Sequence, residues 1–106
     1  MVYTVYTTEK FDKEVKKLSQ EEQERVQKIF LQVKENPYVG DQLQIKILRE
    51  KRLREKRVYY LVFEDLKVVL FVATSDKKTQ QKTIDYIIKY VNEYRGYLRE
   101  LLKYRN

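Results

Sequence analysis

A basic stretch directly before an apolar one is the part of this sequence whose residue types could do chemistry. Residues 49–57 read Arg-Glu-Lys-Arg-Leu-Arg-Glu-Lys-Arg and carry six positive and two negative charges, a net of +4 over nine positions. Residues 58–63, Val-Tyr-Tyr-Leu-Val-Phe, have the composition of a strand. Cations on a rigid sheet bind an anion with less loss of entropy than cations on a mobile tail. The stretch indicates an anion-binding site; the alternative is a solvated edge strand or turn that keeps the protein soluble.

The missing residue types limit the chemistry. The chain of 106 residues has no histidine, the commonest general acid or base, and no cysteine, so disulfides and thiolate metal sites are excluded. Catalysis would use Lys, Arg, Glu, Asp, Tyr or the backbone. Gly40 and Gly96 are too far apart for a glycine-rich phosphate loop. Glu21, Glu22 and Glu24 fit the acidic first turn of a helix, so no metal site and no cofactor are expected.

The overall charge indicates the kind of partner. A formal net charge of +7 attracts polyanions, with nucleic acid as the first candidate and an anionic membrane or an acidic protein as the second. No stretch approaches the roughly 20 apolar residues of a membrane span, and the first residues lack the features of a signal peptide. A cytoplasmic protein is therefore expected. Charged residues make up 37% of the chain, which resembles the composition of thermophile proteins.

The first half of the chain predicts a strand and two helices. Residues 2–7 alternate as a strand does, and Thr7 or Thr8 would cap a helix whose apolar positions recur at 11, 15 and 18. Ser19 and Glu22 form a capping-box pattern that begins a second helix, and Asn36-Pro37 ends it. Two such helices predict a helical hairpin lying on a sheet.

The second half predicts three strands and a long helix. The strands are expected at residues 47–53, 57–64 and 68–73, with a turn at 54–56 and a short connection at 64–67 that makes the last two an antiparallel hairpin. Apolar residues keep helical spacing from about 79 to 104, with Gly96 as the weak point. Such a helix either bends at Gly96 and folds back, or projects and buries Leu98, Leu101 and Leu102 against another chain as a homo-oligomer.

These elements predict an α+β fold in a single domain over residues 1–106. A small, mostly antiparallel sheet of about four strands would carry the helical hairpin and the long C-terminal helix, with the helices largely on one face.

The order of elements and several residue patterns resemble the RelE/ParE superfamily of toxins from toxin–antitoxin systems, in particular archaeal RelE-like sequences. The resembling segments are Phe11–Leu18, Asn36–Tyr38, Leu48–Arg52, Arg57–Val62 and Thr74–Asp85. The strongest is Arg57 followed by apolar and tyrosine positions. The resemblance covers about residues 1–90, and no single motif in it is diagnostic.

The resemblance implies a toxin that a cognate antitoxin holds inactive. RelE-like members cut mRNA on the ribosome, whereas ParE-like members share the fold and poison DNA gyrase. A relative that binds RNA or DNA without cutting it is a further alternative. Metal-independent cleavage would use the RNA's own 2′-hydroxyl as the nucleophile, with basic residues orienting the attack, moving protons and stabilising charge.

The resemblance also implies roles for particular residues. Arg57 is the first candidate for stabilising phosphate charge, with a structural pairing to a nearby acid as the alternative. The further catalytic candidates are Arg54, Lys77 and Lys78, although the two lysines could also belong to a solvated loop. The residues expected to grip the nucleic-acid backbone are Arg49, Lys51, Arg52 and Lys56.

Two features depart from the family pattern. Catalytic members often end with a tyrosine that contacts the substrate, but here a long helix follows, so Tyr86 is only a loose candidate for stacking and could instead pack beside Ile87 and Tyr90. The turn at residues 54–56 also lacks the glycine common in relatives.

Overall fold

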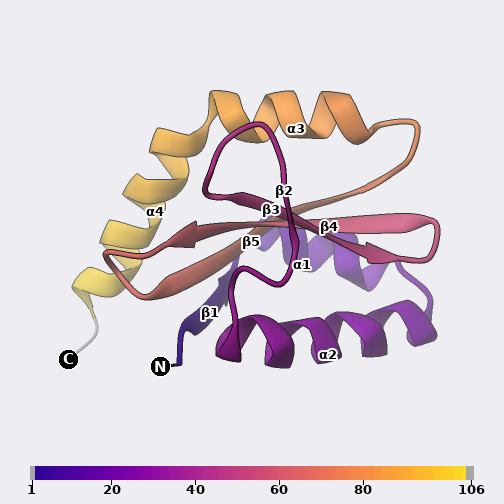
Figure 1. Cartoon of the computed structure of the whole chain (residues 1–106), viewed down its shortest axis with the longest axis horizontal. Helices are drawn as coiled ribbons and strands as arrows, with labels where there is room; N and C mark the ends of the chain where they lie inside the picture. Colours follow the sequence, from indigo (N-terminus) through magenta and orange to yellow (C-terminus); the bar gives the residue numbers. More distant parts are fainter. Residues whose placement is uncertain (1, 105–106) are drawn as a thin grey trace.

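Five strands form one sheet in the computed structural model, which describes residues 2–104 (Figure 1). The strands are β1 (Thr4–Thr7), β2 (Asp41–Gln42), β3 (Leu48–Leu53), β4 (Lys56–Phe63) and β5 (Val68–Asp76). The helices are α1 (Glu9–Lys16), α2 (Gln20–Glu35), α3 (Gln80–Lys89) and α4 (Val91–Lys103). The sheet order is β1-β5-β4-β3-β2, with β1 parallel to β5 and the other neighbours antiparallel. The predicted α+β class and mostly antiparallel sheet are confirmed, and the short β2 adds a fifth strand.

The N-terminal helical hairpin begins and ends where its capping residues predict. The Thr8 hydroxyl accepts a hydrogen bond from the Phe11 backbone N–H at 3.1 Å. Ser19 and Glu22 complete a capping box at 3.0 and 3.1 Å, and α2 stops before Pro37. Both helices cover one face of the sheet. Their apolar residues form the first core cluster with alternate residues of β4: Phe11, Val26, Ile29, Val33, Val58, Tyr60 and Val62.

The opposite face is covered as well, so the expectation of helices largely on one face is wrong. There α3 and α4 pack on the other residues of β4 and form a second core cluster, which includes Tyr59, Leu61, Phe63, Ile84, Ile87 and Leu98. The physical reason lies in the two central strands, whose residues are apolar on both faces. Such strands are stable only between two covering layers.

The predicted single C-terminal helix is two helices. The helical conformation is interrupted at Tyr90, between α3 and α4, and Gly96 lies inside α4. The break lets α4 turn back across the end of the sheet (Figure 1). Leu98 is fully buried there, and Leu101 and Leu102 are partly buried in the same core cluster. These leucines therefore pack on their own chain, which is the folded-back alternative with its bend at Tyr90. None of the helices in residues 2–104 has the length and apolarity of a membrane span.

Candidate nucleic-acid interface

The hairpin of β3 and β4 divides the predicted basic residues between the two faces of the sheet. Leu53 pairs with Lys56, so the turn consists of Arg54 and Glu55, and Arg54 takes the left-handed backbone conformation with φ of 67°. Because successive side chains of a strand alternate, Arg52 and Arg57 are on the α3 side by register. The exposed Arg52 also lines the groove beside α2. Arg49, Lys51 and Lys56 share the α1–α2 side. The nine-residue basic stretch is therefore not one continuous surface.

Arg57 is buried in the sheet. Its side chain is 6% exposed, and its Nε lies 3.6 Å from Oε2 of Glu50, whose side chain is 7% exposed. Glu50 stands opposite Tyr59 in the strand pairing, so it is diagonal to Arg57 on the same face. The Nε of Arg57 has no hydrogen-bond partner among the described residues. The sequence left open whether Arg57 pairs with a nearby acid, and in this structure it pairs with Glu50.

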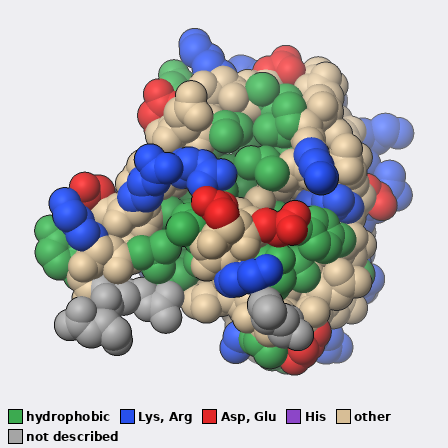
Figure 2. Space-filling model, turned by 60° about the vertical axis from the view of Figure 1, so that its left-hand side comes forward, with side chains coloured by type: hydrophobic (Ala, Val, Ile, Leu, Met, Phe, Trp, Pro, Cys, Tyr) green, Lys and Arg blue, Asp and Glu red, His purple; other side chains and the backbone are tan. Residues whose placement is uncertain are grey.

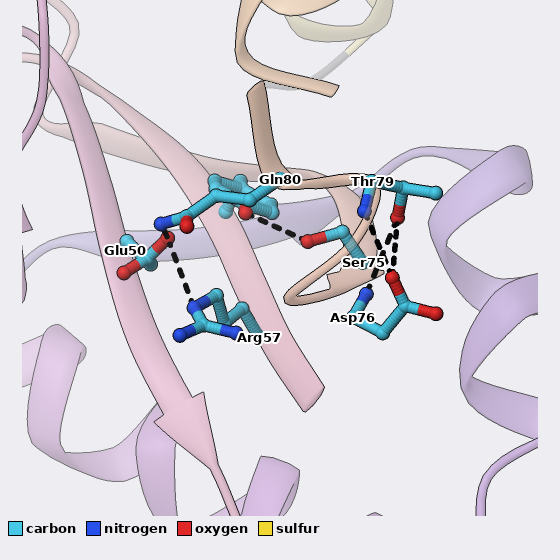
Figure 3. A network of polar contacts seen from close by, with 7 residues as sticks. Glu50, Arg57, Ser75, Asp76, Thr79 and Gln80 are labelled. Atoms are coloured by element: carbon cyan, nitrogen blue, oxygen red, sulfur yellow. Dashed lines mark hydrogen bonds and ion pairs between the residues drawn. The ribbon is translucent and has the colours of Figure 1, made fainter. Parts of the chain in front are cut away.

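Further polar groups surround that ion pair (Figure 3). The side-chain amide of Gln80, at the start of α3, donates a hydrogen bond to Oε2 of Glu50 at 2.8 Å. Tyr59 and Ser75 share a hydrogen bond of 2.7 Å between their hydroxyl groups. Burial raises the pKa of Tyr59 to about 12, so its hydroxyl stays protonated at neutral pH. The network joins β3, β4, β5 and α3.

A β-bulge brings Ser75 into this network. The strand pairing shifts between Tyr59 and Tyr60, so that Tyr60 pairs with Phe71 but Tyr59 pairs with Ala73. The extra residue on β5 changes which side chains face α3 beyond that point. Ser75, rather than Thr74, consequently stands opposite Arg57.

Lys77 and Lys78 lie exposed in the loop that joins β5 to α3. The loop is held by Asp76, whose carboxylate accepts hydrogen bonds from the Thr79 backbone N–H and hydroxyl, each at 2.9 Å. The Thr79 backbone N–H, followed by its hydroxyl, lowers the pKa of Asp76 below its ordinary value. The turn begins at Asp76, directly after Ser75, and the two lysines extend from it.

Arg54 and Lys51 face helix α2 instead. Arg54 forms an ion pair with Glu21 at the start of α2. The two cations line a groove of about 360 Å³ with residues of both charges; these are Glu21, Glu22, Glu24, Arg25, Lys28 and Arg52. Arg54 and Arg57 are therefore not brought together into one catalytic centre.

Arg49 braces the loop that precedes β2. It donates hydrogen bonds to the backbone carbonyls of Tyr38 and Gly40 at 3.3 and 3.1 Å, and its guanidinium lies 5.0 Å from the centre of the Tyr38 ring. These contacts tie Arg49 to the loop, while its buried Nε has no hydrogen-bond partner among the described residues.

Lys56 lines a different depression, at the end of β5. This hollow of about 290 Å³ is also lined by Glu14, Lys17, Leu18, Thr74, Ser75, Asp76 and Thr79. Lys56 stands opposite Asp76 in the strand pairing. It is the predicted backbone-gripping residue closest in register to the Lys77–Lys78 loop.

Tyr86 lies on the exposed side of α3. Its ring centre is 4.7 Å from that of Tyr90, and the ammonium of Lys10 lies 4.9 Å above it. The residue is 46% exposed, so it presents a partly open aromatic surface beside a cation. The packing beside Tyr90 that the sequence offered as an alternative is present.

The residues that sequence reasoning missed are the polar partners of Arg57, namely Glu50 and Gln80. The position of Glu50 beside Arg57 could have been predicted from the sequence, because a two-residue turn at Arg54-Glu55 puts both residues on the same face. Gln80 carried no usable signal, since its position depends on how α3 packs on the sheet.

Solved structures show the same fold. A mutant of the E. coli toxin RelE in the free state aligns with a TM-score of 0.68 at 21% identity, over 82% of this chain and 99% of that one. The archaeal RelE–RelB complex from Pyrococcus horikoshii aligns with a TM-score of 0.67 at 20% identity, over 73% and 97%. The intact E. coli RelBE toxin–antitoxin complex aligns with a TM-score of 0.63 at 23% identity, over 70% and 95%. No protein-family model and no curated protein matches the sequence. The chain has a RelE-like fold.

Proposed function

We propose that this chain is the toxin of a toxin–antitoxin module and cuts mRNA on the ribosome without a metal ion or other cofactor. The observation that carries the proposal is the RelE-like fold over 82% of the chain. The net charge of +7 supports it, because a positive protein is attracted to the phosphate backbone.

The proposed reaction is attack by an RNA 2′-hydroxyl oxygen on the adjacent phosphorus. The new bond to the 2′-oxygen forms as the bond to the 5′-oxygen breaks, which leaves a 2′,3′-cyclic phosphate and a 5′-hydroxyl. Arg57 would stabilise the extra negative charge through its planar guanidinium. Lys77 and Lys78 are the candidates for taking the proton from the 2′-hydroxyl and returning one to the leaving oxygen. Arg52 would grip the RNA strand on the side of Arg57, and Arg49, Lys51, Arg54 and Lys56 would grip it on the α1–α2 side. Tyr86 offers a surface for stacking.

The proposed partner that holds the toxin inactive is a small acidic antitoxin. An apolar groove of about 590 Å³ lies between β1, α2 and α4, and its lining includes Val5, Phe30, Leu31, Tyr97 and Leu101. Figure 2 turns that side of the molecule forward and shows hydrophobic side chains exposed among Lys and Arg side chains. An amphipathic segment with acidic residues would match both properties. A neighbouring reading frame for a short acidic protein would support this partner.

The test is mRNA cleavage in a translating ribosome system, mapped by primer extension. We expect cuts that require ribosomes and that weaken by about 100-fold or more in Arg57→Ala, the scale of losing one group that stabilises transition-state charge. The matched control is Arg99→Ala, which removes an exposed arginine from α4 and should leave cleavage unchanged. Because Arg57 is buried, the melting of each variant is measured first, and a Lys77→Ala/Lys78→Ala variant tests the exposed part of the site. Absence of cuts with well-folded wild-type protein would contradict the proposal.

The second candidate is an RNA-binding relative that does not cut. The observation that favours it is the pairing of Arg57 with Glu50, which neutralises the first candidate for transition-state stabilisation. Salt-dependent RNA binding without cleavage products would distinguish it. If RNA neither binds nor is cut, inhibition of gyrase is the remaining activity to assay.

A further inference from the structure

We propose that Glu50 is a built-in competitor for the anion site of Arg57, so that a phosphate of RNA binds Arg57 only when Glu50 moves away. This inference rests on the proposed function, since it names what regulates that same site. Glu50 is then a residue that controls whether the site is open, and Gln80 is the residue that holds it closed.

The first support is how poorly the pair is satisfied. Both side chains are more than nine-tenths buried, yet the Arg57 Nε lies 3.6 Å from Oε2 of Glu50. A charge-assisted hydrogen bond is typically about 2.7–2.9 Å. The Nε remains without a hydrogen-bond partner among residues 2–104. A buried donor left unsatisfied is costly, so an anion with better geometry would gain by replacing Glu50.

The second support is the link to helix α3. Gln80 donates its 2.8 Å hydrogen bond to Oε2, the same oxygen that faces Arg57 (Figure 3). The position of Glu50 is therefore tied to the first residue of α3. Any ligand that shifts the start of α3, which directly follows the Lys77–Lys78 loop, also shifts Glu50 relative to Arg57.

The third support is the setting. Arg52 stands opposite Arg57 in the strand pairing, and Ser75 stands opposite Arg57 on the other side, with its hydroxyl hydrogen-bonded to that of Tyr59. Lys77 and Lys78 follow Ser75 in the chain by two and three residues. A phosphate group carries charge on several oxygens and matches the guanidinium fork. The positive charges of Arg52, Lys77 and Lys78 would favour a phosphate over a single carboxylate.

The experiment measures anion binding to the intact protein, with no ribosome. Inorganic pyrophosphate and a short RNA with 2′-O-methyl groups, which cannot be cut, are titrated while the Arg57 Nε–H signal is followed by NMR. Glu50→Gln removes the competing charge at nearly constant shape. The matched control is Glu55→Gln, which removes a charge from an exposed residue in the turn of the same hairpin.

We expect Glu50→Gln to bind both ligands about tenfold more tightly than wild type, and Glu55→Gln to differ from wild type by no more than about twofold. Gln80→Ala, which keeps the charge of Glu50 but removes its tether, should fall between them. The gain in affinity for both ligands should disappear in the double variant Glu50→Gln/Arg57→Gln. Gln80→Ala also serves as the test if Glu50→Gln fails to fold.

Equal affinities of Glu50→Gln and Glu55→Gln would overturn the inference, as would a Gln80→Ala variant that binds like wild type. An Arg57 signal that does not respond to ligand in Glu50→Gln would do the same. These outcomes are separate from the proposed function. If the protein binds pyrophosphate at Arg57 but never cuts mRNA, only the proposed nuclease function is contradicted. If it cuts mRNA but Glu50→Gln binds the ligands no more tightly than wild type, only the proposed competition by Glu50 is contradicted.

Discussion

The carboxylate of Glu14 in α1 accepts a hydrogen bond from the backbone N–H of Thr74 in β5 at 2.8 Å, and another from the Thr74 hydroxyl at 3.2 Å. Strand β1 ends at Thr7, opposite Phe71, so Thr74 lies beyond the part of β5 that β1 can pair with. A helix side chain thus supplies the hydrogen bond that a neighbouring strand would otherwise provide. This contact holds β5 in place at Thr74, the residue immediately before Ser75.

Glu14→Ala should destabilise the protein by about 1–3 kcal/mol, because it leaves a partly buried backbone donor without a partner. The measurement is urea unfolding at neutral pH. The control is Glu9→Ala, whose side chain is 84% exposed and forms a surface ion pair with Lys13. That change should cost no more than about 0.5 kcal/mol. Similar losses in both variants would show that the Thr74 contact contributes nothing specific.

The two glycines should respond to alanine in opposite directions. A Cβ on Gly40 would lie 2.7 Å from the Tyr60 hydroxyl and 2.8 Å from the Glu50 carbonyl oxygen. Gly40→Ala should therefore cost about 1–3 kcal/mol through a forced shift. Gly96→Ala meets nothing within 4 Å and lies inside α4, so it should gain about 0.5–1 kcal/mol from helix propensity. Thermal unfolding of the two variants measures both changes in stability. A Gly40→Ala variant as stable as wild type would contradict the close packing around Tyr60.

The stability of the protein should fall as the pH rises from about 10 to about 12. Burial raises the pKa of Tyr59, Tyr60 and Tyr94 to about 12, from an ordinary value of 10.0. In that window the unfolded chain has lost phenol protons that the folded chain retains, so unfolding is favoured. Below about pH 10 the contribution of these protonated tyrosines is complete.

Urea unfolding midpoints across that window measure the slope. Tyr60→Phe should make the slope shallower, because it removes one buried phenol. Tyr104→Phe should leave it unchanged, since Tyr104 is 83% exposed. A slope that is the same in both variants would contradict a role for burial at Tyr60.

Much of the fold could be predicted from local signals. Ser19 with Glu22, and Asn36 before Pro37, act within one turn of the chain, so the helix boundaries they predict are confirmed. The strand predicted at residues 57–64 is likewise confirmed, and its alternation divides Val58, Tyr60 and Val62 from Tyr59, Leu61 and Phe63 between two core clusters. These patterns depend only on the periodicity of a strand or helix.

The remaining features depend on contacts between distant segments. The helix is interrupted at Tyr90, and Leu98 of α4 then packs in the second core cluster. The local sequence marked Gly96, not Tyr90, as the weak point. The bulge that places Ser75 opposite Arg57 has no glycine to mark it. The polar surroundings of Arg57 combine Glu50 from the neighbouring strand with Gln80 from a helix, which binds Glu50. The proposed roles of the basic residues remain predictions.

Leu98→Ala tests whether α4 belongs to the core of its own chain. Leu98 is fully buried in the cluster under α3 and α4, so truncation should cost about 2–5 kcal/mol in urea unfolding. The control is Leu31→Ala, at a side chain that is 65% exposed on α2, which should change stability by no more than about 0.5 kcal/mol. Sedimentation of both variants at several concentrations provides the second readout. A Leu98→Ala protein with nearly wild-type stability and a lower mass would show instead that α4 serves a homo-oligomer, the alternative that its leucines also allowed.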